Sequence, residues 1–328
     1  MILILSDEFD QSTNDVIDWL LYFKKPFIRI NDTDICEIIK IQFEENKTKI
    51  VIKVKNRKID FDDVSTYWYR RGYFNIKIPV IKKEDIPLLY DEVNNSLKKE
   101  LYIIVNFLHV YLQDKYGLGS FLDNRINKLQ TLILARECGL TIPDTIISSQ
   151  KNIIKQFQKD KISIITKAIS ETIMFMVQNV GTILSYTNVV EKHEIDDYNT
   201  LIFPSLFQSK IDKKYELRIF YLDGDFYAMA IFSQTNDKTK IDFRNYDNIK
   251  PNRCIPYKIP TKIKNKLYNF MKETGFKTGS IDMIVNNRNE YIFLEVNPIG
   301  QYGMTSIPCN YYLDKKIAKY LCQIKTTK

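Results

Sequence analysis

The arrangement of apolar segments changes about one third of the way along the chain. Before residue 117, short apolar runs alternate with helical patterns, which is typical of a three-layer domain with a largely parallel sheet. After it, apolar runs of strand length follow one another closely, as they do in antiparallel sheets. The change predicts an α/β fold of several packed units, and 328 residues are enough for two or three of them.

The first part of the chain opens with the apolar run Ile2–Ser6, which predicts a buried strand. Ser12 and Thr13 carry side chains that can cap a helix, and this helix would turn Val16, Ile17, Leu20 and Leu21 inward. Further strands are predicted at Phe27–Ile30, Ile50–Val54 and Val64–Tyr69, and a long helix from Asp85 to about Gln113. These elements define an N-terminal domain over residues 1–117.

The second part of the chain is expected to form two α+β units, residues 118–205 and 206–328. A helix is predicted from about Asn124 to Cys138, with Gly139 as its C-terminal stop. Strands are predicted at Ile162–Lys167, Ile173–Gln178, Ile183–Val189, Leu201–Phe207, Leu217–Leu222, Phe226–Phe232, Ser280–Val285 and Tyr291–Val296. Helices are predicted at Lys151–Gln158, Thr261–Thr274 and Tyr311–Gln323, with Gly275 as the cap of the second.

Composition indicates an ordinary soluble globular protein, with 45% hydrophobic and 27% charged residues. No apolar run reaches the roughly 18 residues of a membrane span, and Ile2–Ser6 is too short for a signal peptide. The five cysteines are scattered and form no CxxC pair, which argues against a disulfide framework or a zinc site. We therefore expect a cytoplasmic protein with no membrane partner.

Histidine content and net charge narrow the function further. The two histidines, His109 and His193, are too far apart for a shared metal site, and His109 is expected to pack in the core. The net charge of +8 would favour an acidic partner, although lysine dominates the composition throughout. No arginine-rich tail is present, so we expect no nucleic-acid partner.

Three oxygen donors interrupt an apolar hairpin near the C-terminus. Asp282 lies in the first strand, and Glu295 and Asn297 lie in the second. Residues two apart on a strand point to the same face, and a four-residue loop at Asn286–Asn289 would put Asp282 on that face too. Mg²⁺ prefers hard oxygen ligands and takes few of them from protein when nucleotide phosphates supply the rest. The pattern predicts a magnesium site.

The alternative is a half-exposed hairpin whose polar face simply meets water. It accounts poorly for carboxylates inside strongly apolar strands, because a buried acid needs a compensating cation. Spacing alone is compatible with both interpretations, and the metal site is the one we favour.

These residues resemble the metal-binding end of the ATP-grasp ligases. Leu294-Glu-Val-Asn-Pro-Ile-Gly-Gln301 is similar to the form found in the peptide maturases that make microviridins and other graspetides. Ser233-Gln234, Asp242-Phe-Arg244 and Trp68-Tyr-Arg70-Arg71 also resemble elements of those enzymes, and the nearest resemblance is to maturases of grasp-with-spasm systems. The resemblance implies an ATP-grasp fold with an N-terminal parallel-sheet domain and two α+β units that hold ATP between them.

The resemblance also implies a set of nucleotide-binding residues. Lys167, at a strand end, and Lys128, at a helix start, would contact the phosphates; the alternative is a lysine that reaches solvent. The segment with the adenine-side residues would supply Leu206, Phe207, Gln208 and Lys213, although an ordinary buried strand would look similar.

One segment departs from the pattern of the family. Many ATP-grasp proteins carry a glycine-rich loop over the triphosphate, whereas the corresponding segment here, Ala168–Ile173, has no glycine. Ser170 and Thr172 would offer hydroxyl and backbone donors in its place.

Arg218 and Arg244 are the implied catalytic residues. Arg218 stands between Leu217 and Ile219, so alternation turns it to the opposite face from these two. Guanidinium groups bind phosphoryl and carboxylate oxygens and stay charged, whereas the alternative, a surface ion pair, contributes little. We expect both arginines at the γ-phosphoryl group or the acyl phosphate.

The implied activity is that of a ligase that uses ATP and Mg²⁺. An acidic side chain of a ribosomal precursor peptide, with a leader and an acidic, Thr-rich core, would take the γ-phosphoryl group and become an acyl phosphate. A hydroxyl or amine would then close an ω-ester or ω-amide ring. Two alternatives stay open: a RimK-like ligase acting on amino acids or protein termini, and a non-catalytic nucleotide- or peptide-binding protein. A homodimer is compatible with each of them.

Overall fold

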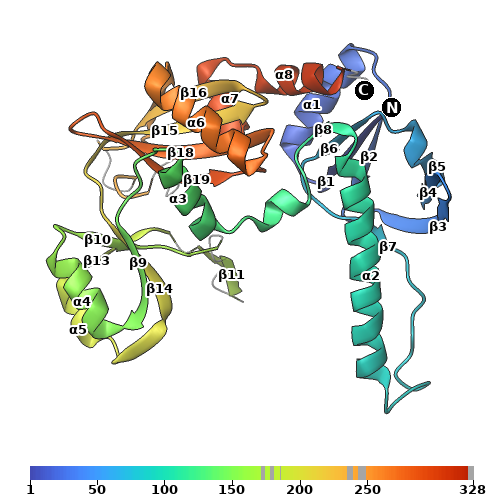
Figure 1. Ribbon diagram of the computed structural model, residues 1–328, viewed down its shortest axis with the longest axis horizontal. Coiled ribbons are helices and arrows are strands. Elements are labelled where there is room, and N and C mark those ends of the chain that lie inside the picture. Colours follow the sequence, from blue (N-terminus) through green and yellow to red (C-terminus); the bar gives the residue numbers. More distant parts are fainter. Residues whose placement is uncertain (171–173, 178–180, 185, 235–238, 243–248, 324–328) are drawn as a thin grey trace. The chain divides into compact units, whose positions relative to one another are not determined.

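The computed structural model describes residues 1–328 except 171–173, 178–180, 185, 235–238, 243–248 and 324–328 (Figure 1). Contacts divide the chain into two compact units. Unit 1 comprises Met1–Arg125, Gln301–Gly303 and Tyr312–Lys328, and unit 2 comprises Ile126–Gly300 and Met304–Tyr311. The division of the chain at residues 117 and 205 stays a prediction. In the described part of the chain, no helix is long and apolar enough to cross a membrane.

A four-stranded parallel sheet forms the centre of unit 1, as the alternation of strands and helices predicts. Its order is β2-β1-β6-β8, with β1 at Ile2–Ser6, β2 at Phe27–Asn31, β6 at Thr66–Tyr69 and β8 at Tyr116–Leu118. Every residue of β1 is buried. Helix α8 (Leu313–Leu321), from the C-terminal end of the chain, packs against α1 (Gln11–Tyr22) in this unit.

Helix α1 differs from its prediction at both its cap and its inner face. The capping side chain is Asp10, which accepts the backbone N–H of Thr13, so neither Ser12 nor Thr13 caps the helix. The buried stripe runs through Thr13, Val16 and Leu20, whereas Leu21 is 59% exposed. Consecutive helical residues lie about 100° apart, so a stripe that contains Leu20 turns Leu21 outward.

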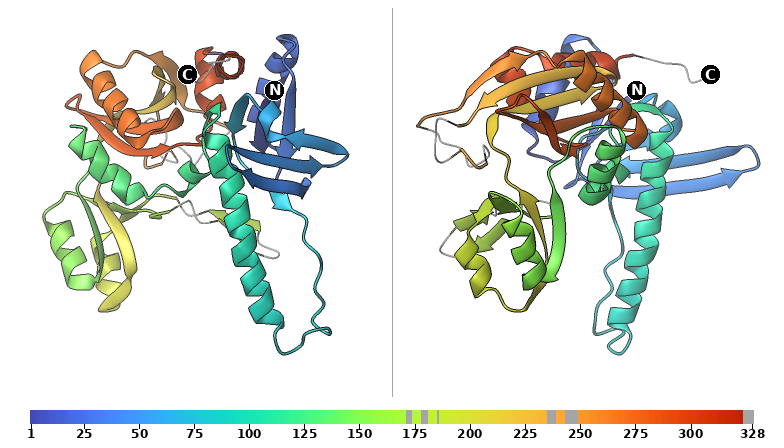
Figure 2. Two further views of the ribbon diagram at one scale, coloured as in Figure 1. Left: turned by 45° about the vertical axis from the view of Figure 1, so that its right-hand side comes forward. Right: turned by 60° about the vertical axis from the view of Figure 1, so that its left-hand side comes forward.

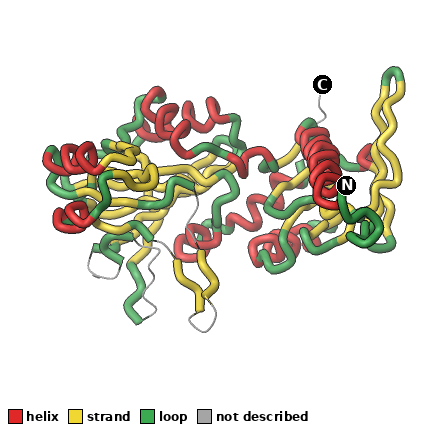
Figure 3. Tube along the Cα trace, turned by 90° about the horizontal axis from the view of Figure 1, so that it is seen from below, coloured by secondary structure: helices red, strands yellow, loops and turns green. Residues whose placement is uncertain are grey.

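A second sheet in unit 1 is mainly antiparallel, with the order β5-β4-β3-β7. It consists of β3 (Ile35–Glu44), β4 (Lys47–Val54), β5 (Arg57–Asp60) and β7 (Asn75–Ile76). The prediction that Ile50–Val54 joins the parallel sheet is wrong. The short turn after Glu44 permits a hairpin, whereas a parallel pair needs a crossover of about a dozen residues. Figures 2 and 3 show β3 and β4 as a long two-stranded ribbon.

Helix α2 (Tyr90–Gln113) is the long helix expected before Gly117, but it begins five positions later than Asp85. Pro87 disfavours helical backbone at Ile86, the residue before it, which argues against a start at Asp85. His109 is fully buried, stacks on Phe121 with ring centroids 3.9 Å apart, and has Nδ1 3.4 Å from the Tyr67 hydroxyl. The prediction that His109 packs in the core is confirmed.

Unit 2 contains a small antiparallel sheet of order β13-β10-β14-β9. Its strands are β9 (Thr145–Gln150), β10 (Ile164–Thr166), β13 (Asn188–Val190) and β14 (Leu201–Ser209). Helices α4 (Lys151–Lys159) and α5 (Lys192–Asp197) contact each other, and α4 packs on β9 and β14 (Figure 2). Strands β11 (Met174–Val177) and β12 (Gly181–Leu184) pair antiparallel in a separate two-stranded sheet.

The large sheet of unit 2 carries the hairpin with the three oxygen donors. Its order is β17-β16-β15-β18-β19, made of β15 (Lys213–Leu222), β16 (Asp225–Phe232), β17 (Arg253–Tyr257), β18 (Thr278–Asn286) and β19 (Tyr291–Asn297). Helix α6 (Thr261–Thr274) ends at Gly275, whose φ of 74° is the left-handed cap that the sequence predicts. Helix α7 (Gly303–Cys309) follows β19 and was not predicted.

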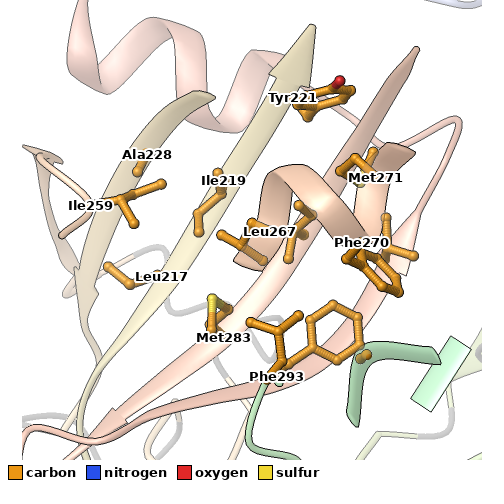
Figure 4. Packing of buried hydrophobic residues seen from close by; sticks show 14 of the residues in the cluster. Leu217, Ile219, Tyr221, Ala228, Ile259, Leu267, Phe270, Met271, Met283 and Phe293 are labelled. Carbon is orange, nitrogen blue, oxygen red and sulfur yellow. The ribbon is translucent and has the colours of Figure 1, made fainter. Parts of the chain in front are cut away.

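One face of this sheet is apolar and packs under α6. Leu267, Phe270 and Met271 of the helix lie over strand residues that include Ile219 and Met283 (Figure 4). Helix α3 (Lys128–Glu137) packs against β19, and it begins after its cap Asn127 rather than at Asn124. Because alternate strand residues face opposite sides, the polar residues of β15, β18 and β19 are directed to the other face.

Candidate active site

A cleft in unit 2 is lined by both its small sheet and its large sheet. The small sheet and its flanks contribute Ile165, Lys167, Thr187, Gln208 and Ser209. The large sheet and its loops contribute Glu216, Leu217, Ile241, Asp242, Asp282, Met283, Ile284, Leu294 and Glu295, with Pro143 and Ile211 completing the lining. Four of the residues that the sequence predicts for the site therefore share this cleft: Lys167, Gln208, Asp282 and Glu295.

The three oxygen donors lie on the same face of the hairpin. Asp282 of β18 is directly opposite Glu295 of β19, and Ser280 is opposite Asn297. Residues opposite each other in an antiparallel pair share a face, as do residues two apart on one strand. The expected convergence of Asp282, Glu295 and Asn297 is thus present in the backbone.

The reason for this convergence differs from the one expected. Asn286 donates its N–H to the carbonyl of Glu290, so the loop has three residues, Asn287–Asn289, rather than four, and Asn289 has a φ of 59°. A register shift between Asp282 and Met283 then adds one residue on β19, because Met283 pairs with Phe293 and Asp282 with Glu295. A three-residue loop alone would turn Asp282 and Glu295 to opposite faces. The extra residue, Leu294, reverses this, so the two carboxylates share a face.

Each carboxylate of the hairpin has a basic partner. Nη1 of Arg218, opposite Asp282 on β15, donates to both carboxylate oxygens at 2.7 and 2.6 Å. Nε of the same guanidinium is buried without a hydrogen-bond partner among the described residues. Nζ of Lys128 lies 3.4 Å from Oε2 of Glu295, at the start of the helix that Asn127 caps. The structure thus places both basic side chains beside the predicted metal ligands.

The donor set fits Mg²⁺. Two carboxylates and one amide oxygen are hard ligands, and a site completed by phosphate oxygens and water needs no more protein groups than these. No cluster of three His, Cys, Asp or Glu side chains suited to a metal ion occurs in the described part of the chain. Asn297 is exposed, and its Oδ1 accepts the N–H of Ile299 at 3.2 Å.

The segment predicted to bind adenine is only partly in the cleft. Gln208 lines it, is 1% exposed, and donates from Nε2 to Thr145 Oγ1 at 2.8 Å. Leu206 and Phe207 are buried and do not line it, and Phe207 packs in the core between the small sheet and its helices. Arg244 and Thr172 lie outside the described residues.

Lys213 is held in a buried network instead of lining the cleft. Its Nζ lies 2.5 Å from Oε1 of Glu216 and donates to the carbonyl of Ile241 at 3.1 Å. Ser233 Oγ donates to the other carboxylate oxygen of Glu216 at 2.7 Å. Burial raises the pKa of Glu216, with Asp242 adding to the shift, although Lys213 and Ser233 oppose it.

Two acidic cleft residues were not predicted as site residues, namely Glu216 and Asp242. Glu216 is two residues from Arg218 on β15, so alternation alone puts it on the same face as the arginine. Asp242 is 7% exposed and accepts the backbone N–H of Thr187 at 3.3 Å. Asp242 follows β16 outside any strand, and the sequence singled it out only as part of the Asp242-Phe-Arg244 resemblance, without assigning it a place in the site.

Solved structures with the same fold span almost the whole chain. A RiPP-associated ATP-grasp ligase from Chryseobacterium gregarium, in complex with ADP and a leader and core peptide, shares 27% identity at a TM-score of 0.80, covering 98% of this chain and 96% of that one. The macrocyclase MdnC from Microcystis aeruginosa MRC, bound with precursor peptide MdnA, shares 26% at a TM-score of 0.78, covering 98% and 99%. The ATP-grasp ligase PsnB, complexed with minimal precursor, Mg and ADP, shares 15% at a TM-score of 0.69, covering 98% and 96%. No protein family model and no curated protein matches the chain.

The fold and these relatives define the class: the chain is an ATP-grasp ligase, an enzyme that forms a bond at the expense of ATP. Within that class it is similar to RiPP-associated ligases, including a peptide macrocyclase. The α/β fold and the family resemblance expected from the Leu294–Gln301 segment are therefore confirmed.

Proposed function

We propose that the chain activates a carboxylate of a ribosomal precursor peptide with ATP and Mg²⁺ and then joins it to a side-chain hydroxyl or amine. One observation carries this proposal: Asp282 and Glu295 face each other in a cleft that also contains Lys167, with Arg218 bonded to Asp282. Carboxylates for a metal beside cations for phosphates form the arrangement that phosphoryl transfer requires.

Each group of the cleft has a part in this reaction. Asp282, Glu295 and Asn297 would hold Mg²⁺, which when bound offsets the charge of the phosphates. Lys167 binds the phosphates, and Gln208 lies along the adenine. Arg218 uses one nitrogen on Asp282, so the rest of its guanidinium can bind the transferring phosphoryl group or the acyl phosphate. We propose the same role for Arg244 and a phosphate contact for Lys128.

The substrate class follows from the relatives and from charge. Two relatives with identities above 25% are complexed with precursor or leader and core peptides. The net charge of +8 favours an acidic core over a basic one, because opposite charge speeds encounter and stabilises the complex. The acceptor would be Thr or Ser for an ω-ester and Lys for an ω-amide. Because the reaction would use ATP and Mg²⁺, we propose the cytoplasm as its location.

The test is mass spectrometry of a purified precursor peptide after incubation with the protein, ATP and Mg²⁺. We expect the mass of one water to be lost for each bond, with one ADP released, and no change with Asp282→Asn. A RimK-like ligase, supplied with a free amino acid, would add the mass of that amino acid less one water to its target. A non-catalytic binding protein would release no ADP above the background without peptide, and either result would overturn the proposal.

We also propose that the chain forms a homodimer through α2. Within this helix only Leu108, His109 and Leu112 are buried, and all three lie near its C-terminal end. Leu97, Leu101 and Ile104 are not buried and recur at spacings of four and three, the repeat of helices that pair along an apolar seam. Light scattering of the parent and of Leu97→Glu tests this: a monomeric parent contradicts it, and a dimeric parent that becomes monomeric supports it.

A further inference from the structure

The chain turns sharply where β19 ends. Gly300 donates its N–H to the carbonyl of Asn297 at 3.0 Å, and Ile299 donates to the Oδ1 of the same residue at 3.2 Å. Pro298 directly follows Asn297 and favours extended backbone at that residue. The turn therefore holds both the backbone and the side chain of Asn297.

The turn brings Gly300 directly over Ser280 of β18. A Cβ added to Gly300 would lie 2.3 Å from the Cβ of Ser280, 2.4 Å from its Oγ and 2.9 Å from the carbonyl oxygen of Asn297. Ser280 is 1% exposed and pairs with Asn297 across the hairpin, so it has little room to move. Gly300 is not one of the glycines with a positive φ. Glycine is therefore required here by the lack of space for a side chain and not by the backbone conformation.

We propose that Ser280 and Gly300 are a size-matched pair that positions Asn297 as the third oxygen donor of the magnesium site. The inference rests on the proposed function, because it assumes that Asn297 is a donor. A larger residue at 300 would push the turn away from β18 and carry the amide of Asn297 with it. Ser280 and Gly300 act through Asn297 and are positioning residues.

The first arm of the test is a size swap measured as metal-dependent nucleotide binding. Gly300→Ala should weaken the binding of Mg²⁺ and ADP in calorimetry about tenfold, since residues that support metal ligands typically contribute that much. Adding Ser280→Gly, which removes the Cβ that the new methyl group meets, should restore most of the affinity. Gly303→Ala is the matched control, because a Cβ there meets no atom within 4 Å.

The second arm separates positioning from general damage. In an Asn297→Ala background, Gly300→Ala should cause little further loss of affinity, because the donor that it displaces is already absent. The inference is overturned if Gly300→Ala binds Mg²⁺ and ADP like the parent, if Ser280→Gly gives no rescue, or if the loss persists in the Asn297→Ala background. A parent that binds no Mg²⁺ and ADP at all would instead overturn the metal site, and the inference with it.

Discussion

Leu294 and Glu295 both face the cleft, although they are consecutive residues of β19. In a regular strand they would point to opposite sides, and Glu295 would be directed toward the apolar face where Phe293 and Val296 pack. The register shift beside Asp282 prevents this. A buried carboxylate without a partner would be costly, so the extra residue both removes that cost and assembles the site.

The first prediction concerns the two hairpin acids. Asp282→Asn and Glu295→Gln keep the shape of each side chain but remove the charge that Mg²⁺ requires. We expect single-turnover release of ADP to fall by at least about a hundredfold, equivalent to about 2.7 kcal/mol. Glu290→Gln is the control, since this acid lies on the same hairpin but is 52% exposed. Near-parental turnover in either cleft variant would refute the metal assignment.

The second prediction separates chemistry from binding at Arg218. Lysine at this position keeps a charge beside Asp282 but loses the other guanidinium donors. Arg218→Lys should keep most of its ATP affinity, whereas kcat should drop by about a hundredfold, because only interactions stronger in the transition state raise the rate. Calorimetry beside single-turnover kinetics tests this, with Arg288→Lys on the hairpin loop as control. If Arg218→Lys turns over as fast as the parent, Arg218 has no catalytic role, and Arg244 becomes the candidate for that role.

The third prediction concerns the buried pair of Lys213 and Glu216, whose side chains are 5% and 8% exposed. Lys213→Met leaves the carboxylate buried without its cation, which should lower the free energy of unfolding by about 3–5 kcal/mol. Adding Glu216→Gln removes the unpaired charge and should recover most of the loss. Denaturant unfolding of both variants measures this. If the single and double variants are equally stable, the loss in Lys213→Met does not come from an unpaired charge on Glu216, and the prediction is wrong.

The fourth prediction is a pH dependence at Asp123, where burial raises the pKa from 3.8 to about 6. The folded state then holds its proton more tightly than the unfolded chain, so stability falls as pH rises between these two values. The loss is complete above about pH 6 and amounts to at most about 3 kcal/mol. Asp123→Asn should melt higher than the parent at pH 8 and lose this advantage near pH 4.

The control for this pH effect is Asp114→Asn, which removes an exposed acid from the same part of unit 1. Its melting temperature should follow that of the parent at both pH values. A constant difference between Asp123→Asn and the parent across the pH range would contradict the assigned cause.

The sequence by itself determined the elements whose signals are local. The bounds of α6 and its cap at Gly275 agree with the structure, and β1 has the limits that its apolar run predicts. The acids at 282 and 295 were found as candidates because their strands are otherwise apolar. Such signals come from residues that are close together in the sequence, within one helical turn or one strand. They are therefore present whatever the element packs against in the folded protein.

Tertiary structure decided what depends on residues far apart. It assigned Ile50–Val54 to the antiparallel sheet, joined Lys213 to Glu216 and Ile241, and brought Asp242 into the cleft. It also set the bulge at Leu294, because the register of a hairpin follows from the turn and from which side chains its sheet can bury. Alternation cannot reveal an inserted residue, since one extra position reverses the face of every residue after it.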